Sequence, residues 1–557
     1  MYLLISIALC RTAWLHPGTS YVGNIADPQE SMWFLEWTPF SVSHAHSPWT
    51  SDFMNYPHGL NLMWNTFTPL AALVIWPITA TLGVVVAYNV LITLAFASAA
   101  WCAWLALRYL RMSPGASFAG GLLYGFSPYM IGQAGGHLHL VLAFFPPLLL
   151  LCVYETVIRQ RHSPVLLGLL LGLLCVAEFF TSEELLLDGV VAAVCSVAIL
   201  ALFARDAVAS RLPYVARVIG SAVVTSAVLL AWPLSVQFFG PERPIGVNHP
   251  KNTYVADLLS FVLPTQNQLI APSAAVAHAN GFSGNPAETT AYLGIPLIIL
   301  LGFAVWRYWR TRLVRVTSLT ALLMAVFAMG SRLHVDGRTT SIPLPWAAVV
   351  RLPLLSDALP VRFMVYFYLL AAVLVAVCVS RLSASGARDA RASMVAAAAV
   401  TVALLPLLPH VPLPASTVTL PQFFSSSRDV SQIPVESTVL TAPFPYRDIV
   451  AVSSLVWQAQ SGMRYKIVGG YWIGPDPPHT VTPQLERVLT DLGSTGVDET
   501  TPALLPALRL ELRAACIRTI VVTPGPYAAR EADLFARLLN RAPAHELDVL
   551  VWWNVNV

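Results

Sequence analysis

Hydrophobic residues form long, nearly uninterrupted runs over the first 410 residues and short alternating stretches after that. A run of about 20 apolar residues is long enough to cross the core of a bilayer as a helix. The pattern therefore predicts a polytopic α-helical membrane protein with about 11 spans. These lie near residues 1–15, 84–109, 116–133, 137–158, 163–180, 184–204, 217–239, 291–309, 314–331, 362–380 and 392–410.

Two apolar segments need separate treatment. We interpret 1–15 as a span because no small-residue cleavage site of a signal peptide follows it. This run is shorter than the ~20 residues of a span, so we expect its true start to lie upstream of Met1. The run 67–82 contains Pro69 and Pro77. We interpret it as a surface or re-entrant helix on the outer side, broken by these prolines.

Arginine marks the cytoplasmic side of the predicted bundle. Short Arg-bearing loops connect the apolar runs, whereas the loop 16–66 has no Lys or Arg and carries four acidic residues. If 67–82 does not cross the bilayer, all Arg-bearing loops lie on the cytoplasmic side. The outer side then holds the loops 16–66, 240–290 and 331–361 and the C-terminus. The Arg-bearing loops are 108–111, 159–161, 205–217, 307–315 and 381–391.

Residues 411–557 change from apolar runs to alternating strands around Ser437–Ala442 and Ile517–Thr523. A charged helical stretch near Arg530–Arg541 precedes a last strand near Leu547–Trp553. This order predicts a soluble C-terminal extracytoplasmic α/β domain, 411–557, after a transmembrane domain, 1–410. The prolines between 406 and 421 suit a linker.

Composition agrees with a bilayer environment. The chain is 56% hydrophobic and only 11% charged, against about 25% charged residues in soluble domains. The net charge of +3 implies no nucleic-acid partner, and the seven cysteines show neither zinc nor redox spacing. The chain has no phosphate-binding loop of the GxxxxGK[ST] type, no Rossmann fingerprint and no HExxH, which argues against an ATP-driven pump and common hydrolases.

The first outer loop offers a candidate catalytic pair, Asp27 and Glu30. If Pro28 begins a helix with Asp27 as its cap, the two carboxylates share one helix face. Such a pair at a membrane surface suits a general base, or a cation held against a phosphate. The structural alternative is a capped helix with a solvated Glu30.

Two further candidates lie at the outer ends of spans. His137 and His139 are two residues apart, so on a helix they do not share a face. Substrate or metal contact by His137 competes with a merely hydrogen-bonded interfacial histidine. Glu178 lies inside an apolar run, where an ionisable group costs ~2.5–3.5 kcal/mol and usually marks a functional site.

Basic residues on the outer side are candidates for binding a phosphate. Arg362 begins a span, where a guanidinium grips a phosphate in bidentate fashion or extends to ordinary headgroups. Lys251 in the loop 240–290 is a second candidate.

These motifs resemble the GT-C superfamily of membrane glycosyltransferases. The likeness rests on the acidic motif after the first span, the proline-bearing helix 67–82 and the span ending in Leu107-Arg108-Tyr109-Leu110-Arg111. The chain is also similar to actinobacterial relatives of the family 39 and YfhO-like membrane proteins. That similarity rests on segments such as 33–37, 55–62, 125–129, 342–346 and 468–471.

The resemblance implies a plasma-membrane enzyme that transfers a sugar from a polyprenyl-phosphate donor to a glycan, lipid or protein acceptor. It implies that Asp27 is the catalytic carboxylate of the first outer loop. Glu30 is a second acidic position, although its three-residue spacing departs from the adjacent acidic pair of many members. Cofactor dependence stays open, with Mg²⁺ or Mn²⁺ as the candidate ions.

Two alternatives from other classes remain open. One is a transporter or flippase of lipid-linked glycans, with Glu178 as a proton or ion site. The other is a non-catalytic protein of envelope assembly, in which Asp27, Glu178 and Arg362 are all dispensable. The acidic first loop favours the enzyme.

Overall fold

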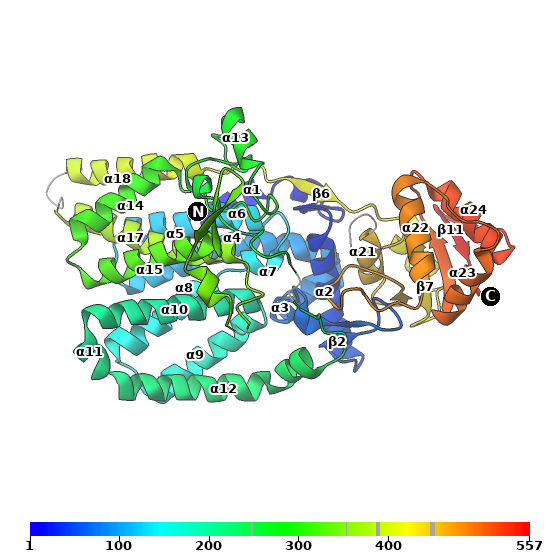
Figure 1. Ribbon diagram of the computed structural model, residues 1–557, viewed down its shortest axis with the longest axis horizontal. Helices are drawn as coiled ribbons and strands as arrows, with labels where there is room; N and C mark the ends of the chain where they lie inside the picture. The colour runs from blue at the N-terminus through cyan, green and yellow to red at the C-terminus, as the bar shows by residue number, and fades with distance from the viewer. Residues whose placement is uncertain (247–248, 353, 386–389, 446–451, 557) are drawn as a thin grey trace. The chain divides into compact units, whose positions relative to one another are not determined.

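The structure is a computed structural model that describes residues 1–246, 249–352, 354–385, 390–445 and 452–556. These residues form two compact units (Figure 1). The helical unit comprises Met1–Thr12, Leu91–Ala231 and His249–Pro414, and the mixed unit comprises Ala13–Val90, Trp232–Asn248 and Ala415–Val557. The mixed unit thus joins the C-terminal tail to the first loop. The domain boundary expected at 410/411 stays a prediction.

The helical unit follows the apolar runs closely. Its helices are α1 (Tyr2–Leu9), most of α4 (Val84–Tyr109), α5 (Pro114–Gly125), α6 (Pro128–Gln133), α7 (Leu138–Val141), α8 (Phe145–Tyr154), α9 (Pro164–Phe179), α10 (Glu183–Phe203), α11 (Arg205–Ala209), most of α12 (Leu212–Phe239), α13 (Ser273–Ala279), α14 (Gly294–Tyr308), α15 (Arg312–Ala328), α16 (Trp346–Val349), α17 (Met364–Ser385) and α18 (Ala390–Leu404). A π-helical turn (Glu155–Arg159), the 3-10 turns η4 (Leu258–Phe261), η5 (Pro360–Phe363) and η6 (Leu405–Leu407) and the hairpin β4–β5 (Arg332–Val335 and Arg338–Pro343) complete it.

The mixed unit combines the first loop with the tail. Its elements are η1 (Ala13–Leu15), β1 (Ser20–Val22), α2 (Asp27–Ser43), β2 (Thr50–Ser51), β3 (Leu60–Asn61), η2 (Leu62–Trp64), α3 (Pro69–Leu82), β6 (Ala415–Thr417), α19 (Gln422–Ser425), α20 (Ser427–Val430), β7 (Thr438–Ala442), α21 (Ser453–Gln460), β8 (Lys466–Ile467), α22 (Pro483–Thr495), α23 (Leu505–Ala514), β9 (Ile517–Val522), α24 (Ala528–Leu539), β10 (Ala544–Glu546) and β11 (Val549–Trp552).

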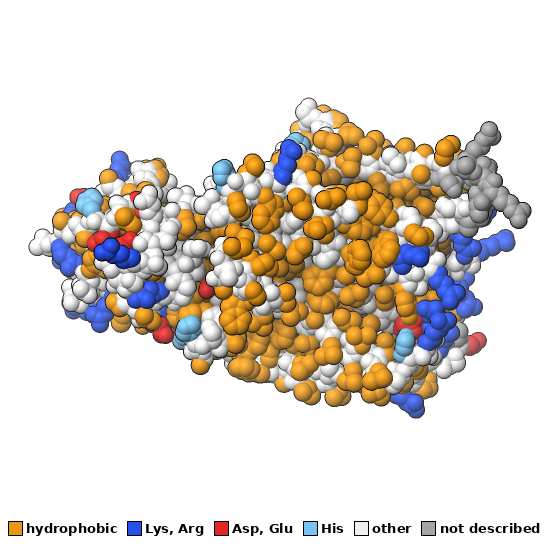
Figure 2. Space-filling view, turned by 180° about the vertical axis from the view of Figure 1, so that it is seen from behind, with side chains coloured by type: hydrophobic (Ala, Val, Ile, Leu, Met, Phe, Trp, Pro, Cys, Tyr) orange, Lys and Arg blue, Asp and Glu red, His pale blue; other side chains and the backbone are white. Residues whose placement is uncertain are grey.

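Several helices of the described chain have the length and composition of membrane spans. Four satisfy both criteria, namely 84–109, 183–203, 212–239 and 360–383, and four more apolar helices are shorter. Figure 2 shows hydrophobic side chains covering a broad face of the helical part, with Lys and Arg side chains gathered at one end. Exposed Leu, Val, Ile and Trp residues on α9, α12 and α14 suit a lipid environment rather than water. The chain is therefore a membrane protein, while the count of about 11 spans stays a prediction.

The pair α9 and α12 illustrates how these helices pack. Pro164 occupies the first turn of α9, where its missing N–H costs nothing. A side chain at Gly168 would lie 2.4 Å from the carbonyl oxygen of Val218, and one at Gly172 would lie 2.7 Å from Thr225 Cβ. Two small residues four apart therefore let the two backbones approach closely, as is common between membrane helices.

The Arg-bearing turns lie at one end of the helical unit. In Figure 1, α11, the α14–α15 turn and the C-terminal end of α17 are found together at that end. Since α10 and α17 run from the opposite end toward it, the residues that begin these helices lie at that opposite end. The Arg-bearing turns thus share one end, as expected, while the assignment of that end to the cytoplasmic side stays a prediction. Residues 386–389 of the last Arg-bearing loop lie outside the described residues.

The tail is built around one five-stranded sheet. The strand order is β10-β11-β9-β7-β8, with β7 parallel to β8 and β9, and β11 antiparallel to β9 and β10. Leucines of α22, α23 and α24 cover it, among them Leu489, Leu512 and Leu534. Strands β7, β9 and β11 and helix α24 lie where the alternation of the sequence predicted them.

Two local predictions were wrong. The prolines do not break the segment 67–82, because α3 is continuous, with Pro69 at its first position and Pro77 inside it. Pro69 begins a helix without losing a bond, and Pro77 removes only one backbone donor from an otherwise apolar helix. The run 1–15 is also not one helix, since α1 ends at Leu9 and a 3-10 turn follows at Ala13–Leu15.

Candidate functional site

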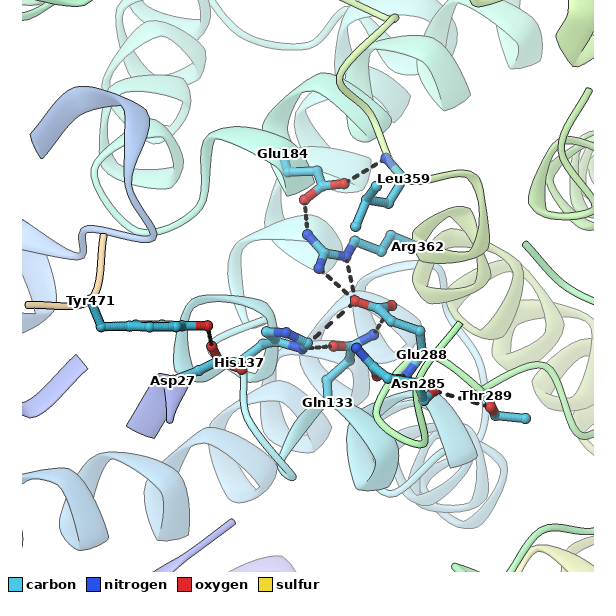
Figure 3. Close-up of polar contacts among 10 residues, drawn as sticks. All are labelled: Asp27, Gln133, His137, Glu184, Asn285, Glu288, Thr289, Leu359, Arg362 and Tyr471. Atoms are coloured by element: carbon cyan, nitrogen blue, oxygen red, sulfur yellow. Dashed lines mark hydrogen bonds and ion pairs between the residues drawn. The ribbon is translucent and has the colours of Figure 1, made fainter. Parts of the chain in front are cut away.

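Asp27 begins helix α2 in the mixed unit. The helix starts at Asp27 itself, with Ala26 at the N-cap, so Asp27 is not the cap that the sequence predicted. The shift of one residue places its carboxylate in the first turn, where the helix dipole favours negative charge. Its Oδ1 accepts a hydrogen bond of 2.7 Å from the hydroxyl of Tyr471 (Figure 3). Asp27 is half-buried.

Glu30 lies one turn after Asp27, on the same side of α2, as its spacing predicted. It is 3% exposed, and its Oε2 accepts a hydrogen bond of 3.2 Å from Thr66 Oγ1. Burial, and then the charge of Asp27, raise the pKa of Glu30 well above its ordinary value. The alternative of a solvated Glu30 is therefore wrong, and the pair divides into one half-buried carboxylate and one that favours its neutral form.

The different environments of Asp27 and Glu30 affect how well the pair can bind Mg²⁺ or Mn²⁺. Mg²⁺ and Mn²⁺ prefer ionised carboxylates and water as ligands. Asp27 offers a half-buried carboxylate, whereas a buried Glu30 that favours its neutral form is a poor ligand. The pair alone does not make a strong site for either ion, and we assign no reaction step to one.

Two closely packed glycines precede Tyr471 and set the backbone conformation that brings its side chain to Asp27. These residues, Gly469 and Gly470, have φ angles of +77° and +137°, which L side chains rarely adopt. A side chain at Gly470 would lie 2.3 Å from Met54 Cγ. In addition, the Gly469 carbonyl accepts a hydrogen bond from the N–H of Asn55. The tail motif 468–471 is therefore fixed against the first loop.

Arg362 lies in a buried ion cluster of the helical unit (Figure 3). Its Nη2 is 2.5 Å from Glu288 Oε1, its Nε donates to the same oxygen at 3.1 Å, and its Nη1 donates to Glu184. The arginine is 8% exposed. The second oxygen of Glu184 accepts the N–H of Leu359, which fixes the turn before α17. Two carboxylates thus occupy the guanidinium, for which the sequence offered a phosphate or ordinary headgroups as partners.

His137 extends this cluster on the side of Glu288. Gln133 donates through Nε2 to Glu288 Oε2 at 2.8 Å, and its Oε1 lies 2.6 Å from His137 Nδ1. His137 Nδ1 is also 3.8 Å from Glu288 Oε1. Burial raises the pKa of Glu288, but the charges of Arg362 and His137 outweigh burial and lower it below its ordinary value. Sequence reasoning missed Glu288 and Gln133.

The rings of His137 and His139 lie close together, although residues two apart do not share a face of a regular helix. Their ring centroids are 5.9 Å apart and nearly perpendicular. The reason is that α7 is a single turn whose N-cap is His137, so the two residues are not on one regular helix. The other predicted cation, Lys251, is exposed in the segment before η4.

Glu178 is fully buried near the end of α9. Neither of its carboxylate oxygens has a hydrogen-bond partner among the described residues, and the same holds for Asp188 on α10. Buried carboxylates without partners are costly, and a functional role for Glu178 stays a prediction.

The chain shares its fold with solved membrane glycosyltransferases. It is 15% identical to the arabinofuranosyltransferase AftD from Mycobacteria, with a TM-score of 0.53. The match covers 100% of this chain and 39% of that one. It is 12% identical to the apo oligosaccharyltransferase of Archaeoglobus fulgidus, with a TM-score of 0.50. This match covers 97% of this chain and 70% of that one. The same archaeal enzyme, AglB, in complex with an inhibitory peptide and a dolichol-phosphate gives 13% identity, a TM-score of 0.50 and the same coverage.

These likenesses confirm the GT-C fold that the sequence motifs predicted. The chain spans about two fifths of the length of the arabinofuranosyltransferase. No curated protein matches the sequence. A family model matches residues 1–407, and the chain therefore belongs to the family DUF6311, whose description is a domain of unknown function.

Proposed function

We propose that this protein is an integral membrane glycosyltransferase. It transfers a sugar from a polyprenyl-phosphate-linked donor to a cell-envelope glycan, lipid or protein acceptor on the outer face of the plasma membrane. The observation that carries the proposal is the half-buried carboxylate of Asp27, held by Tyr471 at the start of α2 in a chain of GT-C fold. The dolichol-phosphate bound by AglB supports a lipid-phosphate donor by analogy of fold.

The reaction is a direct displacement with Asp27 as general base. Asp27 takes the proton of the acceptor hydroxyl as that oxygen attacks the anomeric carbon. The bond between the anomeric carbon and the phosphate oxygen breaks, and the polyprenyl phosphate leaves with the electron pair. A single displacement inverts the configuration at that carbon. Glu30 supports the base as a neutral neighbour that adds no second negative charge beside it.

The leaving phosphate needs a cation on the outer side. Lys251 is exposed, whereas Arg362 directs its donors at Glu184 and Glu288. A phosphate role for Arg362 requires that one carboxylate release it, which makes Lys251 the stronger candidate. His137, at the edge of the Arg362 cluster, and the buried Glu178 stay proposed contacts of the substrate.

Transfer assays with the purified protein test the proposal. Wild type and Asp27→Asn are incubated in nanodiscs with a panel of radiolabelled polyprenyl-phosphate sugars and membrane extract as acceptor. Removing a general base lowers a rate by ~10²–10⁴-fold, so we expect label in a new product with wild type only. Asp533→Asn, an exposed carboxylate on α24, is the matched control and keeps full activity. Equal transfer by a folded Asp27→Asn protein contradicts the proposal.

One observation favours a second function, transport of a lipid-linked glycan. The unpartnered carboxylates of Glu178 and Asp188 have the burial of a proton or ion site. The transporter predicts proton-coupled flux of a labelled lipid-linked glycan across proteoliposomes that Glu178→Gln abolishes. The enzyme predicts that such flux is absent from wild type.

A further inference from the structure

Three potential metal ligands from distant parts of the sequence come together in the mixed unit. His58, Glu242 and His479 place one ligand atom each within 4.8 Å of one another. The Nδ1 atom of His479 is 3.1 Å from both carboxylate oxygens of Glu242, and the ring centroids of His58 and His479 are 5.8 Å apart. Within the described part of the chain, this is the one group of three His, Cys, Asp or Glu residues with such spacing.

A rigid turn of the first loop presents His58. Asn55 Nδ2 donates to the carbonyl of Gly59 at 2.8 Å, and the N–H of Gly59 donates to the carbonyl of Asn55 at 2.9 Å. These two bonds close the turn around His58. A side chain at Gly59 would lie 2.3 Å from the carbonyl oxygen of Ser51, so the turn also packs tightly against its own loop.

The same stretch of the first loop anchors the segment that carries Glu242. Asn61 Nδ2 donates to the carbonyls of Val236 and Pro241, at 2.9 and 3.0 Å. Pro241 directly precedes Glu242. The Glu242 side chain is 11% exposed, so its carboxylate is largely withdrawn from water and benefits from a positively charged partner.

The third segment, which leads to His479, is tied to the next residues of the first loop. The N–H of Ile473 donates to Asn65 Oδ1 at 2.6 Å, and Asn65 Nδ2 donates back to the Ile473 carbonyl at 3.1 Å. Separate hydrogen bonds from residues 55–65 therefore close the turn around His58, hold the residue before Glu242 and hold Ile473, six residues before His479. This is more order than a chance meeting of surface side chains provides.

The donor set indicates the kind of ion. Two imidazoles and one carboxylate suit Zn²⁺ and similar transition-metal ions, whereas Mg²⁺ and Mn²⁺ prefer oxygen ligands. Tetrahedral zinc with bonds of ~2.0–2.1 Å places its ligand atoms roughly 3.3 Å apart. The contact between His479 and Glu242 already has that length. The ligand atom of His58 lies within 4.8 Å of the other two, so binding requires the exposed His58 side chain to turn toward them.

We propose that His58, Glu242 and His479 form a binding site for a divalent transition-metal ion, with Zn²⁺ as the ion to test. Three protein ligands leave a fourth position for water or an anionic group. The ion would fasten the tail segment 473–479 to the first loop, a few residues from Tyr471. The proposal does not depend on the glycosyltransferase function, since binding is measured without a sugar donor.

Metal binding by the full-length protein tests the site. The protein carries an affinity tag without histidine and is purified in detergent, freed of metal with a chelator and titrated with Zn²⁺. We expect about one Zn²⁺ per chain, and with Co²⁺ the visible absorption of a four-coordinate ion. His58→Ala, Glu242→Gln and His479→Ala should each weaken binding at least ~10–100-fold, because even indirect partners of a metal have effects of that size. His545→Ala, an exposed histidine on β10, is the matched control and should bind as wild type.

A second measurement guards against variants that fail to fold. Zn²⁺ should slow proteolysis of the segment 473–482 in wild type and His545→Ala, and should have no effect in His479→Ala. Undiminished binding in His58→Ala and His479→Ala overturns the proposal. Absence of stoichiometric Zn²⁺ binding by wild type also overturns it and leaves only an ion pair between His479 and Glu242.

Discussion

Replacement of Arg362 by methionine tests the buried ion cluster, because methionine keeps much of the side-chain volume and removes the charge. In wild type, the guanidinium donates two hydrogen bonds to Glu288 and one to Glu184. The side chains of Arg362 and Glu288 are 10% and 1% exposed, so water does not replace the lost contacts. Breaking a buried pair from one side costs ~3–5 kcal/mol of unfolding free energy.

Stability should be measured as the free energy of unfolding in mixed micelles, near pH 8, where Glu288 is ionised. Arg332→Met, which removes an exposed arginine on β4, is the control and should stay within ~0.5 kcal/mol of wild type. The double variant Arg362→Met/Glu288→Gln should be more stable than Arg362→Met, because it leaves no buried charge on Glu288.

The destabilisation should also depend on pH. In wild type, the pKa of Glu288 is lowered on balance, so its contribution to stability is present above the ordinary value of 4.5 and is lost as pH falls through its folded pKa. Without Arg362, burial dominates and raises this pKa, so acidification toward pH 5 should relieve the loss. The buried ion cluster does not stabilise the fold in this way if Arg362→Met loses less than ~1 kcal/mol of unfolding free energy, or if the double variant is no more stable than Arg362→Met.

Two further predictions follow from the mixed unit. Tyr471→Phe removes the hydroxyl that holds the Asp27 carboxylate in position, and since a misplaced catalytic group costs up to ~10²-fold in rate, sugar transfer should slow about tenfold or more, with Tyr527→Phe as the unaffected control. An equal rate in Tyr471→Phe contradicts this role. Burial raises the pKa of Glu531 to about 7, so the tail sheet should lose up to about 3 kcal/mol of stability as pH rises from 4.5 through 7. Hydrogen exchange of α24 measures this loss, and Glu531→Gln should abolish its pH dependence.

Local features of this chain could be predicted because the bilayer dictates them. The run 184–204 matches α10 within one residue, since a continuous apolar stretch has one stable form in lipid. The face shared by Asp27 and Glu30 was predictable for a similar reason, because Pro28 favours the first turn of a helix and residues three apart lie on one side of it. In both examples, the information lies within one helix.

The partners of the candidate residues could not be predicted, because they depend on contacts distant in sequence. Glu288 is 74 residues from Arg362, and Tyr471 is 444 residues from Asp27. No periodicity encodes such a pairing. The segment 468–471 carried only a family similarity in the sequence, and the left-handed φ angles of Gly469 and Gly470 that bring Tyr471 to Asp27 are seen only in the structure.

The most direct test of the central claim is product analysis of a single turnover with a donor that the wild-type protein accepts. We expect each labelled sugar joined to acceptor to release one polyprenyl phosphate, the anomeric configuration to be inverted, and Asp27→Asn to give neither product. Transfer with retained configuration, or transfer that persists in Asp27→Asn, would contradict the claim.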